Sequence, residues 1–335
     1  MTENLLALAE FNSVDDVRTL AELLRKRMKA AVQGRDDVIE LVLYALFGDG
    51  HVLLEDYPGS GKTMLAKALG ESIIDDVADD LVPHFRRIQF TPDLLPSDVT
   101  GSLIFDSAKN DFFFRAGPVF SYVLLADEIN RTSPKVQAAL LEAMAEKQVT
   151  VDNTTHKLDE LFFVMATQNP LDLVGTYPLP VAQLDRFLFK IRMVHIEREA
   201  ELSVLSLWNS PRLAPPLPKA TRTQIVKARA WMRQGVHIAP AIMETLVDAF
   251  RILRADPRVA QGASTRAMIL AIPALQARAA MDGRDFVSAA DIDAILVPLL
   301  THRVAFRVGV ESPEAVLKEA AKGPLEKLAK AVLKG

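Results

Sequence analysis

The stretch that decides the fold reads Leu53-Leu54-Glu55-Asp56-Tyr57-Pro58-Gly59-Ser60-Gly61-Lys62-Thr63. A short apolar run beginning at Val52 leads into it, and a helical stretch from Met64 to Gly70 follows. A strand, a glycine-rich turn and a helix N-terminus in this order form a phosphate site. Glycines let backbone N–H groups curl around an anion, and the helix N-terminus adds unpaired donors and the positive end of its dipole.

The pattern is G-x-x-x-x-G-K-[ST], in which Lys62 reaches the β- and γ-phosphates and the Thr63 hydroxyl ligates Mg²⁺. The alternative is a glycine-rich turn with an incidental lysine, which the motifs further along the chain make less favourable. Besides Lys62 and Thr63, the residues predicted to bind the nucleotide at this loop are Pro58, Gly59, Ser60, Gly61 and Met64.

One position departs from the pattern, because Asp56 stands where the first glycine is expected. A carboxylate near the β-phosphate would repel it unless the side chain turned away. Two alternatives follow: Asp56 points to solvent and leaves ATP binding intact, or the nucleotide site is weakened. We favour the first, since every other catalytic position is filled.

The composition is that of a globular protein with enough apolar material for one large domain or two ordinary ones. The chain has 335 residues, of which half are hydrophobic and 24% are charged. Its net charge of −4 gives no sign of the excess of positive charge that is typical of tight nucleic-acid binding. The absence of cysteine excludes disulfides and thiolate ligands and fits a cytoplasmic protein. No signal-peptide pattern, membrane-length apolar run or two-histidine metal motif is present in the sequence.

Apolar runs alternate with helical patterns in the first part of the chain. Strands are predicted at 52–54, 85–90, 123–128, 161–166 and 190–196, with helices at 17–28, 38–46 and 134–146. Such alternation is typical of an α/β fold with a doubly wound parallel sheet. Two additions are predicted, an insertion at about 91–117 that projects from the core and a β-hairpin at about 148–158.

The rest of the chain is predicted to form a separate helical domain. Pro211, Pro215, Pro216 and Pro218 make a stiff linker at 208–220, which divides a core at 1–207 from an all-α domain at 221–335. Helices are predicted at 222–233, 240–254, 264–281, 288–305 and 313–333, and the last is expected to break in two at Gly323-Pro324.

Polar residues follow two of the buried strands. Asp127 and Glu128 end the run Val123-Leu124-Leu125-Ala126, and Asn169 ends the neighbouring strand. Ligands of α/β sheets lie at the carboxyl ends of strands. Asp127 would hold Mg²⁺ through water, Glu128 would orient or deprotonate the attacking water, and Asn169 would position that water. The alternatives are an ordinary exposed acid pair and a turn asparagine before Pro170.

Two arginines and an aromatic cluster are further candidates. Arg186 lies just before the last strand, and Arg266 lies in the first turn of a helix, where a cation opposes the dipole unless it faces an anion. Either could also be a solvated surface residue. Phe112-Phe113-Phe114 is either a tip that grips a substrate or a strand that faces the core.

Taken together, these motifs resemble the MoxR family of AAA+ ATPases, from about residue 33 to 194 and more weakly through the helical domain. Besides the phosphate loop, the matching stretches are IQFTPDLLPSDVTG (88–101), ADEINR (126–131), LEAM (141–144), ATQNP (166–170), GTYPLP (175–180), AQLDRF (182–187) and GASTRA (262–267). Eight motifs in the family's order make a far more specific signal than a phosphate loop alone.

The resemblance implies an α/β ATPase core with a C-terminal helical lid, assembled as a homo-oligomeric ring that is usually a hexamer. ATP or ADP with Mg²⁺ would bind between subunits. By similarity, Asp127 and Glu128 are the Walker B acids, Asn169 is sensor 1, Arg186 is the arginine finger supplied to a neighbour and Arg266 is sensor 2.

The resemblance also implies that Gln33 and Gly34 lie near adenine, and that the insertion within helix 2 and the hairpin before sensor 1 face the ring's central region. Relatives act as chaperone-like remodellers of a protein client, often with a partner that carries a von Willebrand factor A domain. Three other functions stay open: a nucleotide-dependent scaffold or switch, which Asp56 favours, an MCM-like nucleic-acid motor, which the charge of −4 disfavours, and, least favoured, a small-molecule kinase.

Overall fold

The computed structural model describes residues 10–55, 57, 59–77, 82–170, 175–206 and 217–332. Asp56 and Pro58 therefore lie outside the described residues, as do Pro211, Pro215 and Pro216 of the predicted linker. None of the helices within these ranges combines the length and the apolar character that a membrane crossing requires.

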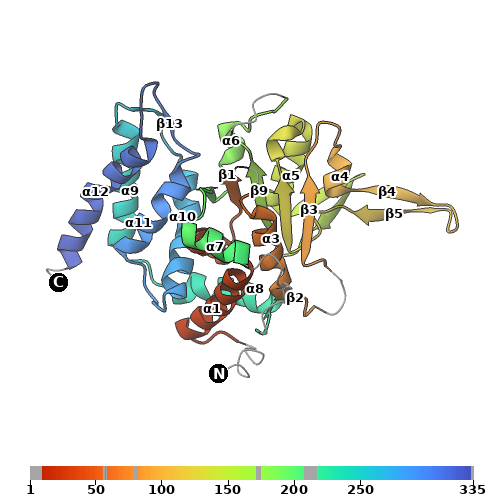
Figure 1. Ribbon diagram of the computed structural model, residues 1–335, viewed down its shortest axis with the longest axis horizontal. Coiled ribbons are helices and arrows are strands. Elements are labelled where there is room, and N and C mark those ends of the chain that lie inside the picture. Colours follow the sequence, from red (N-terminus) through yellow and green to blue (C-terminus); the bar gives the residue numbers. More distant parts are fainter. Residues whose placement is uncertain are drawn as a thin grey trace.

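Five parallel strands form the sheet at the centre of the molecule (Figure 1), as the sequence predicts. The second and third predicted strands keep their places, whereas the fourth is shifted by two residues and so includes Thr167. The last is shorter than predicted. In spatial order the strands are β10 (Phe189–Arg192), β1 (Val52–Glu55), β9 (Phe163–Gln168), β6 (Val123–Asp127) and β3 (Phe85–Gln89).

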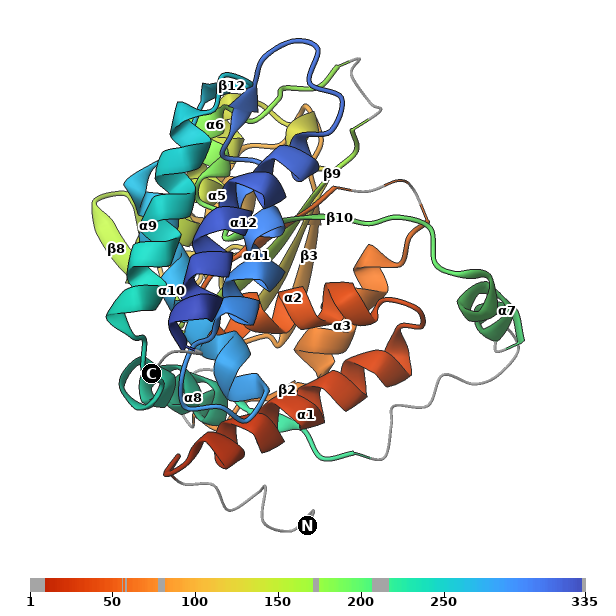
Figure 2. The same cartoon turned by 90° about the vertical axis from the view of Figure 1, so that its left-hand side faces the viewer.

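The sheet is buried on both faces, and alternate side chains of a strand serve opposite faces. In β6, Val123 and Leu125 pack in the cluster that includes α3 (Lys62–Glu71), whereas Leu124 and Ala126 pack with α5 (Pro134–Glu146). Figure 2 shows α3 and α5 on opposite sides of the strands. The helix that follows the phosphate loop is thus separated from α5 by the full thickness of the sheet.

The helices of the C-terminal part share one continuous hydrophobic cluster with the α3 face of the sheet. Helix α10 packs against α1 and α2 (Figure 1). The helices involved are α1 (Val14–Ala31), α2 (Asp36–Phe47), α8 (Arg222–Gly235), α9 (Pro240–Ala255), α10 (Thr265–Met281), α11 (Ala289–Leu300) and α12 (Pro313–Val332).

The prediction of an all-α domain from residue 221 onward needs a small correction. Strand β11 (Ala220–Thr221) pairs with β2 (Ile73–Ile74), and β12 (Val259–Gln261) pairs with β13 (Ala305–Phe306). The helix predicted at 288–305 accordingly ends at Leu300, and the chain turns into β13. A helix that the sequence did not predict, α7 (Arg198–Ser206), precedes the linker.

The predicted break at Gly323-Pro324 is wrong, since α12 continues through both residues. A proline inside a helix removes one hydrogen bond, and a glycine adds a conformational cost. Buried side chains lie on both sides of this point, with Val316, Leu317 and Leu328 in the common cluster. Packing of α12 against α9 and the burial of these side chains therefore outweigh the local penalty.

The insertion and the predicted hairpin are both present. The insertion contains α4 (Pro96–Thr100), β4 (Gly101–Asp106) and β5 (Asp111–Ala116), and its two strands project from the body (Figure 1). Of the two alternatives for Phe112-Phe113-Phe114, the core-facing strand is wrong: the strand is present as β5, but Phe112 is 62% and Phe113 49% exposed. The Phe114 ring stacks on the His156 ring, with 3.8 Å between the ring centroids. That contact joins the insertion to the second hairpin, β7 (Gln148–Val151) and β8 (Thr154–Lys157).

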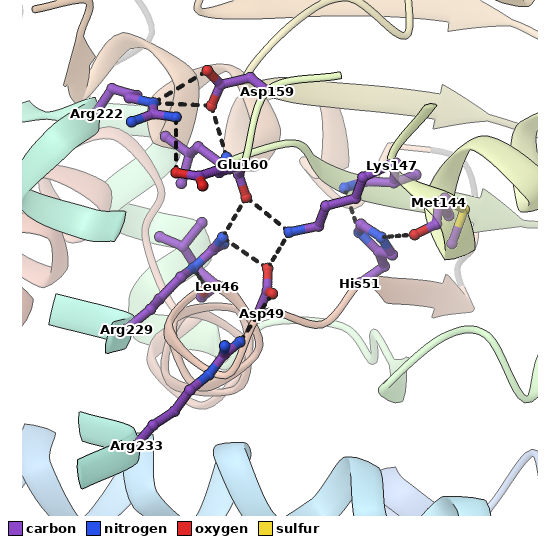
Figure 3. Close-up of polar contacts among 12 residues, drawn as sticks. Leu46, Asp49, His51, Met144, Lys147, Asp159, Glu160, Arg222, Arg229 and Arg233 are labelled. Carbon is purple, nitrogen blue, oxygen red and sulfur yellow. Dashed lines mark hydrogen bonds and ion pairs between the residues drawn. The ribbon is translucent and has the colours of Figure 1, made fainter. Parts of the chain in front are cut away.

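An ionic network around the buried Arg229 fixes α8 to the sheet near the N-terminal ends of β1 and β9 (Figure 3). The Asp49 carboxylate accepts hydrogen bonds from Lys147 Nζ at 2.6 Å and Arg229 Nη1 at 2.8 Å, and Arg233 Nη2 lies at 3.2 Å. Lys147 and Arg229 also donate to the Glu160 carbonyl oxygen, each at 2.8 Å. Burial would raise the pKa of Asp49, but the charges of Arg229 and Lys147 hold it below its usual value.

Replacement of Asp49 by asparagine should be costly. Asp49 has a left-handed backbone with φ of 58°, which asparagine also tolerates, so Asp49→Asn removes the charge without adding strain. Arg229, only 5% exposed, would lose its counter-charge. We expect the free energy of unfolding in urea to fall by about 3 kcal/mol.

Glu22→Gln is the matched control, since Glu22 forms an exposed pair with Arg18 along α1. It should cost less than about 0.5 kcal/mol. Equal losses in the two variants would show that the buried network contributes no more than a surface pair.

His51 gives the fold a dependence on pH. Its Nδ1 accepts a hydrogen bond from the Val164 backbone N–H at 3.0 Å, so the neutral ring carries its proton on Nε2, 3.3 Å from the Met144 carbonyl oxygen. Burial lowers the pKa of His51 to about 4. In the unfolded chain the pKa of a histidine is ~6.5. As the pH falls, His51 therefore binds a proton in the unfolded chain before it does so in the folded protein. The contribution of the neutral His51 to stability is therefore complete above the unfolded pKa, and it is lost as the pH falls toward the folded pKa of about 4.

Urea unfolding between pH 7 and 4 tests this linkage. Between these two pH values the free energy of unfolding should fall by about 3 kcal/mol because of His51, since each unit of pKa difference corresponds to ~1.4 kcal/mol. His51→Gln should have a shallower pH dependence by that amount, while His237→Gln, at an exposed position, should keep the wild-type slope. Parallel slopes for all three proteins would contradict the assignment.

Candidate active site

The parallel topology brings the predicted site residues to one edge of the sheet. The phosphate loop follows β1, Asp127 ends β6 and Asn169 follows β9, and these three strands are neighbours with the same direction. The Lys62 Nζ lies 3.5 Å from Asp127 Oδ1. The motif lysine and the acid that is predicted to bind the metal are therefore close together.

The loop itself has the geometry of an open cradle. Gly59 and Gly61 have φ of 90° and 92°, and a Cβ at either position would meet nothing within 4 Å. Only glycine holds this left-handed backbone at no cost, so backbone N–H groups can line open space. Helix α3 begins directly after it at Lys62, with Thr63 in its first turn. This open loop before a helix N-terminus fits a phosphate group.

Arg35 holds the loop in place, and the sequence did not predict this role. Its side chain is buried and donates to the Ser60 carbonyl oxygen at 3.1 Å and to the Val194 carbonyl oxygen. Arg35 is the residue before α2, and Val194 follows β10. Three segments that are distant in the sequence are thereby fixed around the loop.

The predicted adenine segment lies against α7. Gly34 has φ of 67°, and a Cβ there would stand 2.5 Å from the Cβ of Ala200. Gln33 donates from Nε2 to the Lys29 carbonyl oxygen at 3.2 Å. The close approach of α7 explains why glycine is needed at position 34. It also places α7, the helix that follows β10, beside the segment that contains Gln33.

Asp127 is held as a charged, buried acid. Its Oδ1 accepts a hydrogen bond from Thr167 Oγ1 at 2.7 Å, and its Oδ2 accepts one from Arg87 Nη2 at 2.7 Å. Burial would raise the pKa of Asp127, but the hydrogen bonds from Arg87 and Thr167 and the charge of Lys62 hold it below its usual value. An ionised carboxylate supplies the oxygen ligands that a hard divalent cation prefers.

Glu128 is turned toward β3. Its backbone is left-handed with φ of 58°, and its N–H donates to Thr167 Oγ1 at 2.8 Å. One carboxylate oxygen, Oε2, accepts from Gln89 Nε2 at 2.6 Å and lies 3.2 Å from Arg131 Nε. Thr167 therefore supports both acids at once. Sequence reasoning missed it because the strand was predicted to end one residue earlier.

Arg186 lies apart from Lys62, on the α5 face of the sheet. It follows α6 (Val181–Leu184), and its guanidinium donates to the Leu141 carbonyl oxygen of α5. Figure 2 shows α5 and α6 on the side opposite α3. The structure thus does not bring Arg186 to the phosphate loop of the same chain. It lies in a hollow of about 480 Å³ together with Ala138, Leu141, Glu142, Glu146, Gln148 and Gln183.

Arg266 is exposed in the first turn of α10. Arg303 holds the segment around Arg186 in place: its buried side chain donates to Asp185 Oδ1 at 2.6 Å and to the Leu188 carbonyl oxygen at 2.9 Å. Burial lowers the pKa of Arg303 and Asp185 raises it, while the nearby charge of Arg266 lowers it further. The sequence around Arg303 gave no sign of this role.

Comparison with protein families identifies both parts of the chain. Residues 51–189 match the ATPase family associated with various cellular activities (AAA), and residues 251–320 match the AAA lid domain. These matches agree with the α/β sheet core and the C-terminal helical part described above.

Individual relatives cover nearly the whole chain. The uncharacterized protein YeaC of Bacillus subtilis is 43% identical, over 94% of this chain and 98% of its own length. Chaperone MoxR1 of Mycobacterium tuberculosis is 36% identical, over 86% of this chain and 76% of its own length. A crystal structure from Cytophaga hutchinsonii, described as that of a candidate ATPase, superimposes with a TM-score of 0.83 at 34% identity, covering 92% of this chain and 95% of the other.

Thr167→Val tests the support of the two acids. Valine keeps the shape but removes the donor to Asp127 and the acceptor of the Glu128 N–H, in a side chain that is fully buried. A buried N–H without an acceptor costs about 1–3 kcal/mol, so urea unfolding without nucleotide should show a loss of that size. Thr167→Ser keeps both hydrogen bonds and should lose clearly less. A valine variant as stable as the serine variant would mean that the hydroxyl is dispensable.

Proposed function

The chain belongs to the MoxR family of AAA+ ATPases, and on that premise we propose that it binds ATP with Mg²⁺ and hydrolyses it as a homo-oligomeric ring. The observation that carries the proposal is the pairing of a buried, ionised Asp127 with Lys62 at 3.5 Å beside an open glycine loop. A cation and an acid held this close at the end of a strand suit a phosphate chain and its metal ion.

The roles follow from position. Lys62 contacts the β- and γ-phosphates, the Thr63 hydroxyl binds Mg²⁺ directly, and Asp127 binds it through water. Bound Mg²⁺ would neutralise charge on the phosphate oxygens. Glu128 orients or deprotonates the attacking water, and Asn169 positions that water from the end of β9.

The remaining nucleotide contacts come from the loop and from the segment before α2. Gly59, Ser60 and Gly61 offer backbone N–H groups to the phosphates. Met64, in the first turn of α3, and Pro58, outside the described residues, are retained as predicted nucleotide contacts. Gln33 and Gly34 lie near adenine, a placement supported by the approach of α7 to Gly34. We retain the interpretation that Asp56 turns to solvent.

Arg186 acts on the nucleotide of a neighbouring subunit. Its support is its place on the α5 face, since the sheet separates it from the phosphate loop of its own chain. Arg266, exposed in the first turn of α10, acts as sensor 2. A closed ring, usually a hexamer in this family, satisfies both requirements at every site.

The work done by ATP turnover is proposed to be chaperone-like remodelling of a protein client in the cytoplasm, with a von Willebrand factor A domain protein as a possible partner class. Exposed Phe112 and Phe113 on the projecting hairpin support a client-contacting surface. The proposed division is a core at 1–207, a linker at 208–220 and a lid at 221–335. A net charge of −4 weighs against a nucleic-acid motor.

Steady-state ATP hydrolysis across a protein dilution series, with mass photometry on the same samples, tests the proposal. Turnover per subunit should rise with assembly, because Arg186 comes from a neighbour. Arg186→Ala should lower kcat by about 10³-fold or more, in the range of arginine fingers, and leave nucleotide binding intact. Equal turnover by dilute monomer and by assembled protein would contradict it. Assembly without turnover would favour the scaffold or switch that Asp56 suggests.

A further inference from the structure

The loop that carries Arg186 is held on both sides of that residue by one side chain from the helical part of the chain. Arg303 donates from Nε to Asp185 Oδ1 at 2.6 Å and from Nη2 to the Asp185 carbonyl oxygen at 3.1 Å. It also donates to the carbonyl oxygens of Phe187 and Leu188, the latter at 2.9 Å. The residues directly before and after Arg186 are therefore bonded to the same guanidinium group.

Arg303 is itself fixed to the helical part. It follows α11, and its Nη1 also donates to the Leu299 carbonyl oxygen near the end of that helix. The preceding residue, His302, is buried and contacts the same loop, with its Nε2 2.9 Å from the Phe187 carbonyl oxygen. Arg303 lies within the stretch that matches the AAA lid domain, whereas its loop partners lie within the stretch that matches the AAA ATPase family.

Arginine suits this task better than lysine does. Its planar guanidinium has five N–H donors, which can reach acceptors in several directions at once. A lysine ammonium could keep the ion pair with Asp185, but as a single point charge it could not also reach the carbonyl groups beyond Arg186. Only 3% of Arg303 is exposed, so water cannot replace the bonds that such a change would remove.

We propose that Arg303 is a positioning residue for Arg186, so that the helical part of one subunit sets the place from which its arginine reaches the nucleotide of the next subunit. The inference rests on the role proposed above for Arg186 at a neighbouring site, and it adds the residue that connects this role to the helical part. A shift of α11 relative to the sheet would move Arg303, and the bonded loop would follow.

Steady-state kinetics of the assembled full-length protein give the first test. Arg303→Lys should lower kcat by about 10²-fold, the loss expected when a catalytic group is displaced by roughly 1 Å. KM for ATP should stay unchanged, because neither Arg303 nor its bonded partners belong to the predicted nucleotide site of the same chain. Arg307→Lys, at an exposed arginine of the same segment, is the matched control and should keep the wild-type kcat.

Mixed rings separate a misplaced arginine from general damage to the fold. Lys62→Ala subunits should not hold nucleotide, but they still offer a normal Arg186 to a neighbour. In rings of Arg303→Lys and Lys62→Ala subunits, turnover per intact site should rise toward the wild-type value as the Lys62→Ala fraction increases. The reason is that an Arg303→Lys subunit keeps an intact site and receives a well-placed arginine from such a neighbour.

The reverse mixture asks whether Arg303 is needed in the subunit that supplies the arginine. Arg186→Ala subunits mixed with Lys62→Ala subunits should recover turnover. Arg186→Ala subunits mixed with the double variant Lys62→Ala/Arg303→Lys should not. Equal recovery in the two mixtures would overturn the inference, as would Arg303→Lys sites that stay slow beside Lys62→Ala neighbours.

The mixture of Arg186→Ala with Lys62→Ala also tests the proposed function by itself. If it recovers no turnover while the wild-type protein hydrolyses ATP, the role of Arg186 at a neighbouring site is refuted. If it recovers turnover and Arg303→Lys subunits supply the arginine normally, only the role of Arg303 is refuted.

A second variant covers the case in which urea unfolding shows that Arg303→Lys does not fold. Asp185→Asn then takes its place in both mixtures, because the asparagine amide oxygen can still accept from Arg303 Nε but carries no charge. Its kcat should fall by about tenfold, since a charge-assisted hydrogen bond becomes a neutral one. A wild-type kcat in a folded Asp185→Asn would overturn the inference.

Discussion

The common direction of the five strands is the constraint on which the site depends. Because β1, β6 and β9 are neighbours and parallel, their carboxyl ends meet at one edge. Lys62 and Asp127 come within 3.5 Å of each other although 65 residues of sequence separate them. A parallel sheet must be buried on both faces, and this requirement recruits α3 to one face and α5 to the other.

The two ends of the sheet use ion-paired carboxylates in different ways. At the N-terminal end, Asp49 contacts three cations from two elements, which fixes α8 rigidly to the core. At the carboxyl end, Asp127 contacts Lys62 and Arg87, and Arg87 is half exposed. Pairing lowers the pKa of both acids despite their burial. The first acid joins two elements of the fold, whereas the second lies beside the lysine of the glycine loop.

Local signals predicted much of this structure, and long-range contacts account for what they missed. The glycine loop, the helix over 134–146 and the hairpin at 148–158 depend on neighbours in sequence, and each was found at or near its predicted bounds. Thr167, Arg87 and Arg303 act through partners at least 40 residues away, and no local pattern marks them. The helix break predicted at Pro324 does not occur for the same reason, since the packing of α12 on α9 outweighs the hydrogen bond lost at the proline.

The sheet also acts as a partition, and this bears on why a single copy should be incomplete. Lys62 starts α3 on one face, while Arg186 is bonded to α5 on the other, in a hollow shared with Glu142 and Glu146. Side chains cannot cross a layer filled by Leu124, Leu125 and their neighbours. If Arg186 serves a nucleotide, that nucleotide belongs to another chain. The burial that stabilises the parallel sheet would then be the reason that hydrolysis requires assembly.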